Sequence, residues 1–251
     1  MNLLEGINPT TRIAGVALLT LPLLLSVDVV SATVALAFTL LAAPWCGMSY
    51  GQLMRRSWPI FLAAVLAGIS MALYGRPEGR EYASLWLAHI TDNSLHLAAA
   101  IMVRVLAVAL PVVIMAAHVD PTDLGDGLAQ VWHLPARFVI GAVAAVRLLS
   151  LFQRDWASLG RARRARGIAD VGTIPYALTM CFGLLVLALR RGSKLATAME
   201  ARGFDRAQTR TWARPSTVQR RDWVVLLVCA GVGFAAIMVS VVTGSFHFLG
   251  A

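Results

Sequence analysis

The chain alternates long apolar runs with short polar connectors. Five of the apolar runs are candidates for membrane-crossing helices, at residues 13–25, 29–45, 58–74, 95–117 and 223–242. A perpendicular crossing needs about 20 apolar residues, and the first run is shorter, so we expect the first two runs to form a tight helical hairpin with Asp28 at its tip. The pattern predicts an all-α integral membrane protein with about five transmembrane helices.

Two further segments are apolar in their first half and basic in their second. They run from Ala136 to Arg166 and from Pro175 to Arg202. A single crossing by the second segment would place basic residues on both sides of the bilayer, against the positive-inside rule. Two crossings would restore the sidedness, but the apolar part of the first segment, 138–152, is short and contains Arg147. We therefore expect two long helices that do not cross.

The charge distribution then gives a consistent topology. Residues 137–221 hold 16 basic and 4 acidic side chains, a net charge of +12, whereas the whole chain carries +9. With a cytoplasmic N-terminus, four crossings return the chain to the cytoplasm and a fifth leads to an external C-terminus. The predicted organisation is transmembrane helices 1–4 in residues 1–117, a cytoplasmic domain of one short and two long crossing helices in 118–210, and the last transmembrane helix in 211–251. Basic residues that obey a topology rule require no nucleic acid partner.

The connectors carry weaker signals. Residues 75–94 are predicted to be a mixed loop, with a short interfacial helix around Tyr82 to Ile90. Asp120 followed by Pro121 is typical of a helix start, which explains the nearby aspartates better than a metal site does. The three cysteines are widely separated in apolar stretches, which indicates neither a disulfide framework nor a zinc site.

Two patterns suggest other functions. Residues 47–51 match the Gly-x-Ser-x-Gly pattern of a hydrolase nucleophile around Ser49, but no strand signal precedes them. Arg104 and Pro111 interrupt the fourth apolar run, and a charged residue within a membrane segment is a functional candidate. A self-contained secondary transporter is therefore the alternative function, although Arg104 fits packing against a helix carbonyl, or extension to the interface, at least as well.

The most distinctive motif is a tripeptide that ends both long segments. Ala165-Arg166-Gly167 and Ala201-Arg202-Gly203 lie 36 residues apart. Glycine suits the position after a helix because it adopts positive φ, and arginine in the last turn complements the negative end of the helix dipole. Each copy is thus predicted to be a helix end, and two equivalent ends indicate two equivalent partners.

With these motifs in place, the chain resembles the T component, of the EcfT/CbiQ type, of energy-coupling factor (ECF) transporters, which are ABC importers for vitamins and metal ions. The resemblance rests on the paired Ala-Arg-Gly endings and extends over nearly the whole chain. Further matching stretches are Asn8-Pro9-Thr10-Thr11-Arg12, Asp120-Pro121-Thr122-Asp123-Leu124, Leu134-Pro135, and Ala198-Met199-Glu200 before the second ending. Arg163 departs from the pattern, because such proteins often place glutamine there.

The resemblance implies a coupling subunit of the bacterial or archaeal cell membrane, not an enzyme. Two ABC ATPases would use ATP and magnesium, and this chain, which lacks a Gly-x-x-x-x-Gly-Lys-Ser/Thr motif, would bind no cofactor itself. A substrate-binding S component would rest on the apolar faces of the coupling helices. The residues implied to dock the ATPases are Ala165, Arg166, Gly167, Glu200, Ala201, Arg202 and Gly203.

Overall fold

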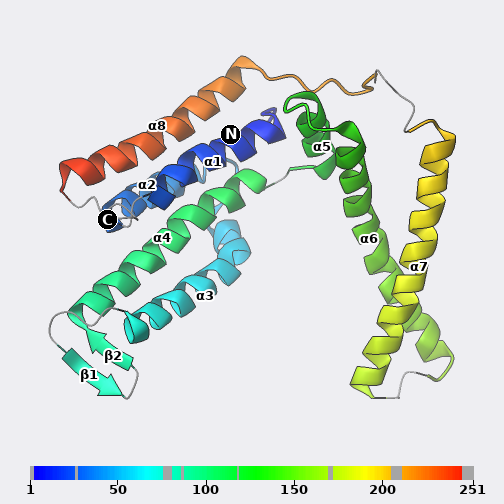
Figure 1. Ribbon diagram of the computed structural model, residues 1–251, viewed down its shortest axis with the longest axis horizontal. Helices are drawn as coiled ribbons and strands as arrows, with labels where there is room; N and C mark the ends of the chain where they lie inside the picture. The colour runs from blue at the N-terminus through cyan, green and yellow to red at the C-terminus, as the bar shows by residue number, and fades with distance from the viewer. Residues whose placement is uncertain are drawn as a thin grey trace. The chain divides into compact units, whose positions relative to one another are not determined.

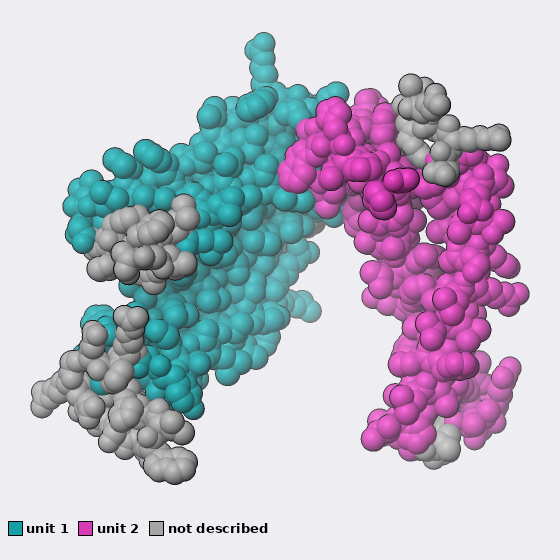
Figure 2. Space-filling view, in the orientation of Figure 1, with its two compact units in different colours: residues 1–120, 217–251 teal, residues 121–216 magenta. Residues whose placement is uncertain are grey.

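The computed structural model describes residues 3–25, 28–75, 81–85, 88–117, 119–168, 172–204 and 211–244. Within these ranges the chain forms eight helices and one β-hairpin (Figure 1). It divides into two compact units, which Figure 2 colours separately. The first, called the membrane unit below, comprises residues 1–120 and 217–251, and the second, called the coupling unit, comprises residues 121–216.

Five helices build the membrane unit. They are α1 (Pro9–Leu25), α2 (Val29–Ala42), α3 (Tyr50–Tyr74), α4 (Asp92–Ala116) and α8 (Arg220–Val242). Helix α3 packs along α4, α1 packs along α8, and α2 contacts both α4 and α8. The predicted all-α class is therefore confirmed.

Polar residues placed just before the helices explain where three of them begin. Asp28 caps α2 by accepting a hydrogen bond from the Ser31 amide at 2.7 Å. Ser49 caps α3 in a capping box with Gln52, and Thr91 caps α4 in the same way. Helix α3 thus begins well before the predicted apolar run. The serine of the Gly-x-Ser-x-Gly pattern serves here as a helix cap.

Glycines allow α1 and α8 to approach closely. A side-chain carbon added at Gly233 would lie 2.9 Å from the Leu18 carbonyl oxygen, and one at Gly15 would lie 3.2 Å from the sulfur of Cys229. Small residues at such crossings are typical of membrane helix packing, where van der Waals contact replaces the hydrophobic effect. The α1–α8 pair is therefore tightly packed.

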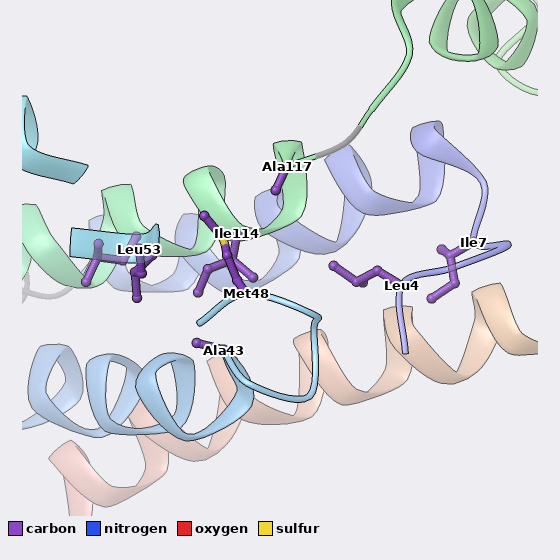
Figure 3. Close-up of a cluster of buried hydrophobic side chains, with 8 residues drawn as sticks. Leu4, Ile7, Ala43, Met48, Leu53, Ile114 and Ala117 are labelled. Carbon is purple, nitrogen blue, oxygen red and sulfur yellow. The ribbon is translucent and has the colours of Figure 1, made fainter. Parts of the chain in front are cut away.

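A second cluster of buried side chains fixes the N-terminal segment. Leu4 and Ile7 pack with Ala43 and Met48 from the α2–α3 connection, and with Ala117 at the end of α4 (Figure 3). The chain before α1 is therefore part of the core of the membrane unit.

The predicted short helix from Tyr82 to Ile90 is wrong. Strand β1 (Glu81–Leu85) pairs antiparallel with β2 (Ala88–Thr91), with Leu85 opposite Ala88. Thr91 ends β2 and also caps α4, so the second strand leads directly into that helix.

The coupling unit contains α5 (Pro121–Gln130), α6 (Ala136–Ala165) and α7 (Thr173–Ala201). Helix α5 begins at the predicted proline, and both long helices agree with the predicted bounds to within two residues. The side-chain amide of Gln130 holds the returning chain, since it donates to the Arg214 carbonyl and accepts from the Ser216 amide, each at 2.9 Å.

Five described helices are long and apolar enough to cross a membrane: α3, α4, α6, α7 and α8. The chain is accordingly a multi-pass membrane protein. The number equals the predicted one, but the membership differs. Helices α1 and α2, predicted as crossings, have only 17 and 14 residues, whereas α6 and α7, predicted not to cross, meet the criteria of length and composition.

Candidate functional site at the ends of α6 and α7

The first Ala-Arg-Gly motif forms the C-terminal end of α6. Ala165 is the last helical residue, Arg166 is the cap, and Gly167 follows with φ +69°. The Gly167 amide donates to the Arg164 carbonyl and the Ile168 amide donates to the Arg163 carbonyl, both at 3.1 Å. This pair of bonds is a Schellman motif, which satisfies carbonyls that a helix end leaves without partners.

The second motif repeats this geometry at the end of α7. Gly203 has φ +72°, and its amide donates to the Glu200 carbonyl at 2.9 Å. The Phe204 amide donates to the Met199 carbonyl at 3.1 Å. The cap residues also agree, with φ −90° and ψ 1° at Arg166 and φ −87° and ψ 7° at Arg202. The predicted helix ends are thus confirmed at both copies.

Backbone conformation explains why glycine stands at both ends. A side-chain carbon added at Gly167 or Gly203 would meet nothing within 4 Å, so space does not exclude a larger residue. Positive φ does, because it strains other L-amino acids. Arg166 and Arg202 are both exposed, so two identical turns each present a guanidinium group at the surface.

The two helices are antiparallel, and their motifs therefore lie at opposite ends of the pair (Figure 1). Asp155 contacts Arg191, and Arg163 contacts Thr179, so residues late in α6 meet residues early and midway in α7. Because α7 has 29 residues, the two ends are separated by about 43 Å at a rise of 1.5 Å per residue. The structure brings together the residues within each motif and keeps the two motifs apart.

Contact between the helices is confined to a short crossing. Both helices are described over their full length. Over that length, α6 buries Gly160 alone, and α7 buries Met180 alone. A side-chain carbon at Gly160 would lie 3.3 Å from the Tyr176 hydroxyl oxygen. This small residue therefore sets how closely the helices cross.

An ion pair braces the crossing. Both guanidinium Nη atoms of Arg191 donate to the Asp155 carboxylate, and the Nη2–Oδ1 distance is 2.9 Å. Sequence reasoning missed this pair, although Asp155 is the single acidic residue of α6 and so gave a signal. Bidentate arginine–carboxylate pairs fix geometry as well as adding energy.

Helix α7 also presents an apolar stripe that the chain itself leaves exposed. Its members recur at intervals of three or four residues, which places them on one face of a helix. They are Ile174, Leu178, Phe182, Leu185 and Leu189, with between 54 % and 73 % of their surface exposed. An exposed apolar stripe of this kind marks a surface that contacts either a protein partner or the membrane.

Residues 1–212 match the CbiQ family, whose description is cobalt transport protein. The chain belongs to the CbiQ family. The match includes both Ala-Arg-Gly motifs and most of the membrane unit, so the predicted resemblance is confirmed.

Relatives of this CbiQ chain are named energy-coupling factor transporter transmembrane protein EcfT. The protein of Limosilactobacillus fermentum is 27 % identical over 60 % of this chain, and the match spans 61 % of that relative, less than two thirds of its length. The protein of Exiguobacterium sibiricum is 24 % identical over 79 % of this chain and 80 % of its own. That of Brevibacillus brevis is 22 % identical over 90 % and 89 %.

Arg163 is where this CbiQ chain departs from the expected pattern, and the structure accounts for its side chain. Both of its Nη atoms donate to Thr179 of α7, one to the hydroxyl and one to the carbonyl at 3.0 Å. Arg163 thus braces the helix pair, while Arg166 remains exposed at the surface.

Proposed function

We propose that the chain is the coupling subunit of an ECF-type importer, in which α6 and α7 transmit the motion of two ABC ATPases to a substrate-binding S component. The observation that carries this proposal is the pair of matching arginine-bearing helix ends at opposite ends of one antiparallel pair. Two equal surfaces separated by the length of a helix suit two copies of one kind of partner.

Arginine suits the docking role chemically. Its planar guanidinium group pairs bidentately with a carboxylate, which lysine cannot do. Each ATPase would offer acidic side chains to Arg166 or Arg202, with the flanking motif residues and Glu200 shaping the contact. ATP and magnesium would be bound by the ATPases.

The apolar stripe of α7 is the proposed seat of the S component. A small membrane protein has an apolar surface of its own, so the two surfaces would exclude water and lipid from each other. The transported vitamin or metal ion would be selected by that subunit. In this arrangement α6 and α7 lie at the cytoplasmic face of the cell membrane, and the N-terminus is cytoplasmic.

Charge reversal at both motifs tests the ATPase contact. The double variant Arg166→Glu with Arg202→Glu is expected to abolish co-purification of ABC ATPases with the full chain in mild detergent. The matched control is Arg161→Glu with Arg190→Glu, which changes the charge equally at exposed positions of the same helices outside the motifs. Retention of the ATPases by the motif variant, or equal loss in the control, would contradict the proposal.

The single variants add a test of stoichiometry. Because each helix end would hold one ATPase, Arg166→Glu alone or Arg202→Glu alone is expected to leave a complex with one ATPase copy instead of two. Native mass spectrometry measures this number directly. Loss of both copies in each single variant would mean that the ends do not bind independently.

A further inference from the structure

The coupling unit joins the membrane unit through two connections, and the membrane unit holds the root of each. One root is Ala117, the residue that caps the end of α4. The other is Gln219, the residue that caps the start of α8. Movement of the coupling unit would act on the membrane helices through these two roots.

The N-terminal segment is hydrogen-bonded to both roots. Arg12 donates from Nη1 to the Ala117 carbonyl at 3.3 Å. The Asn8 amide donates to Asp222 Oδ1 at 2.8 Å, and the other oxygen of that carboxylate accepts from the Gln219 amide at 2.6 Å. A stretch of five residues, 8–12, thus connects the end of α4 to the start of α8.

This connection is buried, although it is charged. Asp222 is fully buried and Arg12 is 9 % exposed. An aspartate near a helix start needs no burial to act as a cap, and burying charged groups is costly unless they are well bonded. Arg12 also donates to the Leu4 carbonyl, and Leu4 and Ile7 belong to the same cluster of buried side chains as Ala117 (Figure 3). The N-terminal segment is thus held both by hydrogen bonds and by apolar packing.

We propose that Arg12 and Asp222 are positioning residues for energy coupling: through the N-terminal segment they fix the roots of α4 and α8 to each other, so that the two helices respond together. This inference rests on the proposed function, because it concerns how motion of the coupling unit reaches the membrane helices. Without the connection, Ala117 and Gln219 would move independently of each other, and motion of the coupling unit would not reach α4 and α8 together.

Hydrogen exchange on the chain alone tests the connection without any ATPase. Arg12 is bonded at the α4 root, yet Arg12→Gln is expected to speed exchange of the Gln219 and Asp222 amides at the α8 root at least tenfold. Asp222→Asn is expected to do the same for the Ala117 and Val119 amides. Amides of the α3–α4 pair serve as the control and should remain unchanged.

Acceleration at the substituted residue's own root alone would overturn the inference, as would equal acceleration throughout the membrane unit. Where a neutral variant does not reach the membrane, Arg12→Lys and Asp222→Glu serve instead. Each should still speed exchange at the other root, by a smaller factor. These outcomes are independent of whether an ATPase binds.

A second experiment uses the complex purified with its ATPases in nanodiscs, with magnesium ATP and vanadate as the probe. In the unmodified complex we expect the nucleotide to alter exchange in α6 and α7 and also in α4 and α8. In Arg12→Gln and Asp222→Asn the response of α6 and α7 should persist, and that of α4 and α8 should fall at least fivefold. A retained response in α4 and α8 would overturn the inference, whereas absence of any response in the unmodified complex would count against the proposed function instead.

Arg104→Gln is the matched control for that experiment. Arg104 donates to the Leu23 carbonyl near the far end of α1, so it shares the chemistry of Arg12 away from both roots. Its variant should keep the nucleotide response of α4 and α8. Loss of that response in Arg104→Gln would assign the effect to general weakening of the helix packing and overturn the inference.

Discussion

Helices α8 and α7 are both long and apolar enough to cross a membrane, yet they differ in how their residues are used. Helix α8 confines its charges to its first turn, and residues 223–242 form 20 positions without a charge. One of its faces buries Cys229, Gly233 and Ala236 against neighbouring helices. Helix α7 has only 17 uncharged positions, 173–189, before Arg190, and it buries Met180 alone of its fully described length.

Two helices of similar length and apolar content thus differ in how they pack and in where their charges lie. A crossing helix needs about 20 uncharged residues, a face that fits its neighbours and charges confined to its ends. Helix α7 reaches the lower limit of the length range, but over its described length it buries Met180 alone and carries charges throughout its second half. The proposed function assigns the apolar stripe to a protein partner and the basic half to the cytoplasm.

Enlarging a packed glycine should damage α8 most. Gly233→Leu would place its side chain against the Leu18 carbonyl, a backbone atom that cannot move without shifting α1. We expect a loss of roughly 3 kcal/mol, the upper end of overpacking effects, seen as a lower thermal aggregation temperature in detergent. Gly231→Leu is the control on the same helix, because a side-chain carbon there meets nothing within 4 Å. An equal loss in the control would mean that helix packing is not the cause.

The brace between α6 and α7 should matter less. Asp155 and Arg191 are partly exposed, at 16 % and 37 % of their side-chain surface, so solvent weakens their attraction, and a double-mutant cycle with Asp155→Asn and Arg191→Gln should give a coupling energy of about 1 kcal/mol. Thermal unfolding of the full chain measures it. Strictly additive single effects would show that the pair is merely adjacent. The crossing would then be held by apolar contact and by the hydrogen bonds from Arg163 to Thr179.

The turn at the α7 end, which repeats the geometry of the turn at the α6 end, should respond to backbone strain. Gly203→Ala adds a methyl group in open space, but the alanine must adopt φ near +72°. This strain costs about 1 kcal/mol. Affinity for the partner ATPase should fall roughly fivefold, since 1.4 kcal/mol corresponds to a factor of ten. Gly203→Asn should lose less, because asparagine tolerates positive φ better than alanine does. Equal affinity in both variants would indicate that the turn is not needed for docking.

The sequence was sufficient to predict the ends of α6 and α7 because each is decided locally. Glycine at positive φ and arginine in the last turn act within a few residues, as they do at Gly167 and Arg166. The contacts that required three dimensions could not be foreseen: Asp155 finds Arg191 at a separation of 36 residues, and Asn8 finds Asp222 at 214. The strands β1 and β2 pair locally, but they were missed because residues 86–87 between them, Trp-Leu, carry none of the glycine, asparagine or aspartate signals of a hairpin turn.

The last prediction concerns the side of the membrane on which the ends of α6 and α7 lie. Cysteines placed at 168 and 204, after replacement of Cys46, Cys181 and Cys229 by alanine, should react with a membrane-impermeant maleimide from the same side, and only when the cytoplasmic face is open. Thr243→Cys, at the exposed far end of α8, should react from the outside and so reports that the membrane is sealed. Because 168 follows α6 and 204 follows α7, labelling from opposite faces would mean that α7 crosses the bilayer. Helix α7 would then belong with α8, and its basic half could not serve two cytoplasmic ATPases.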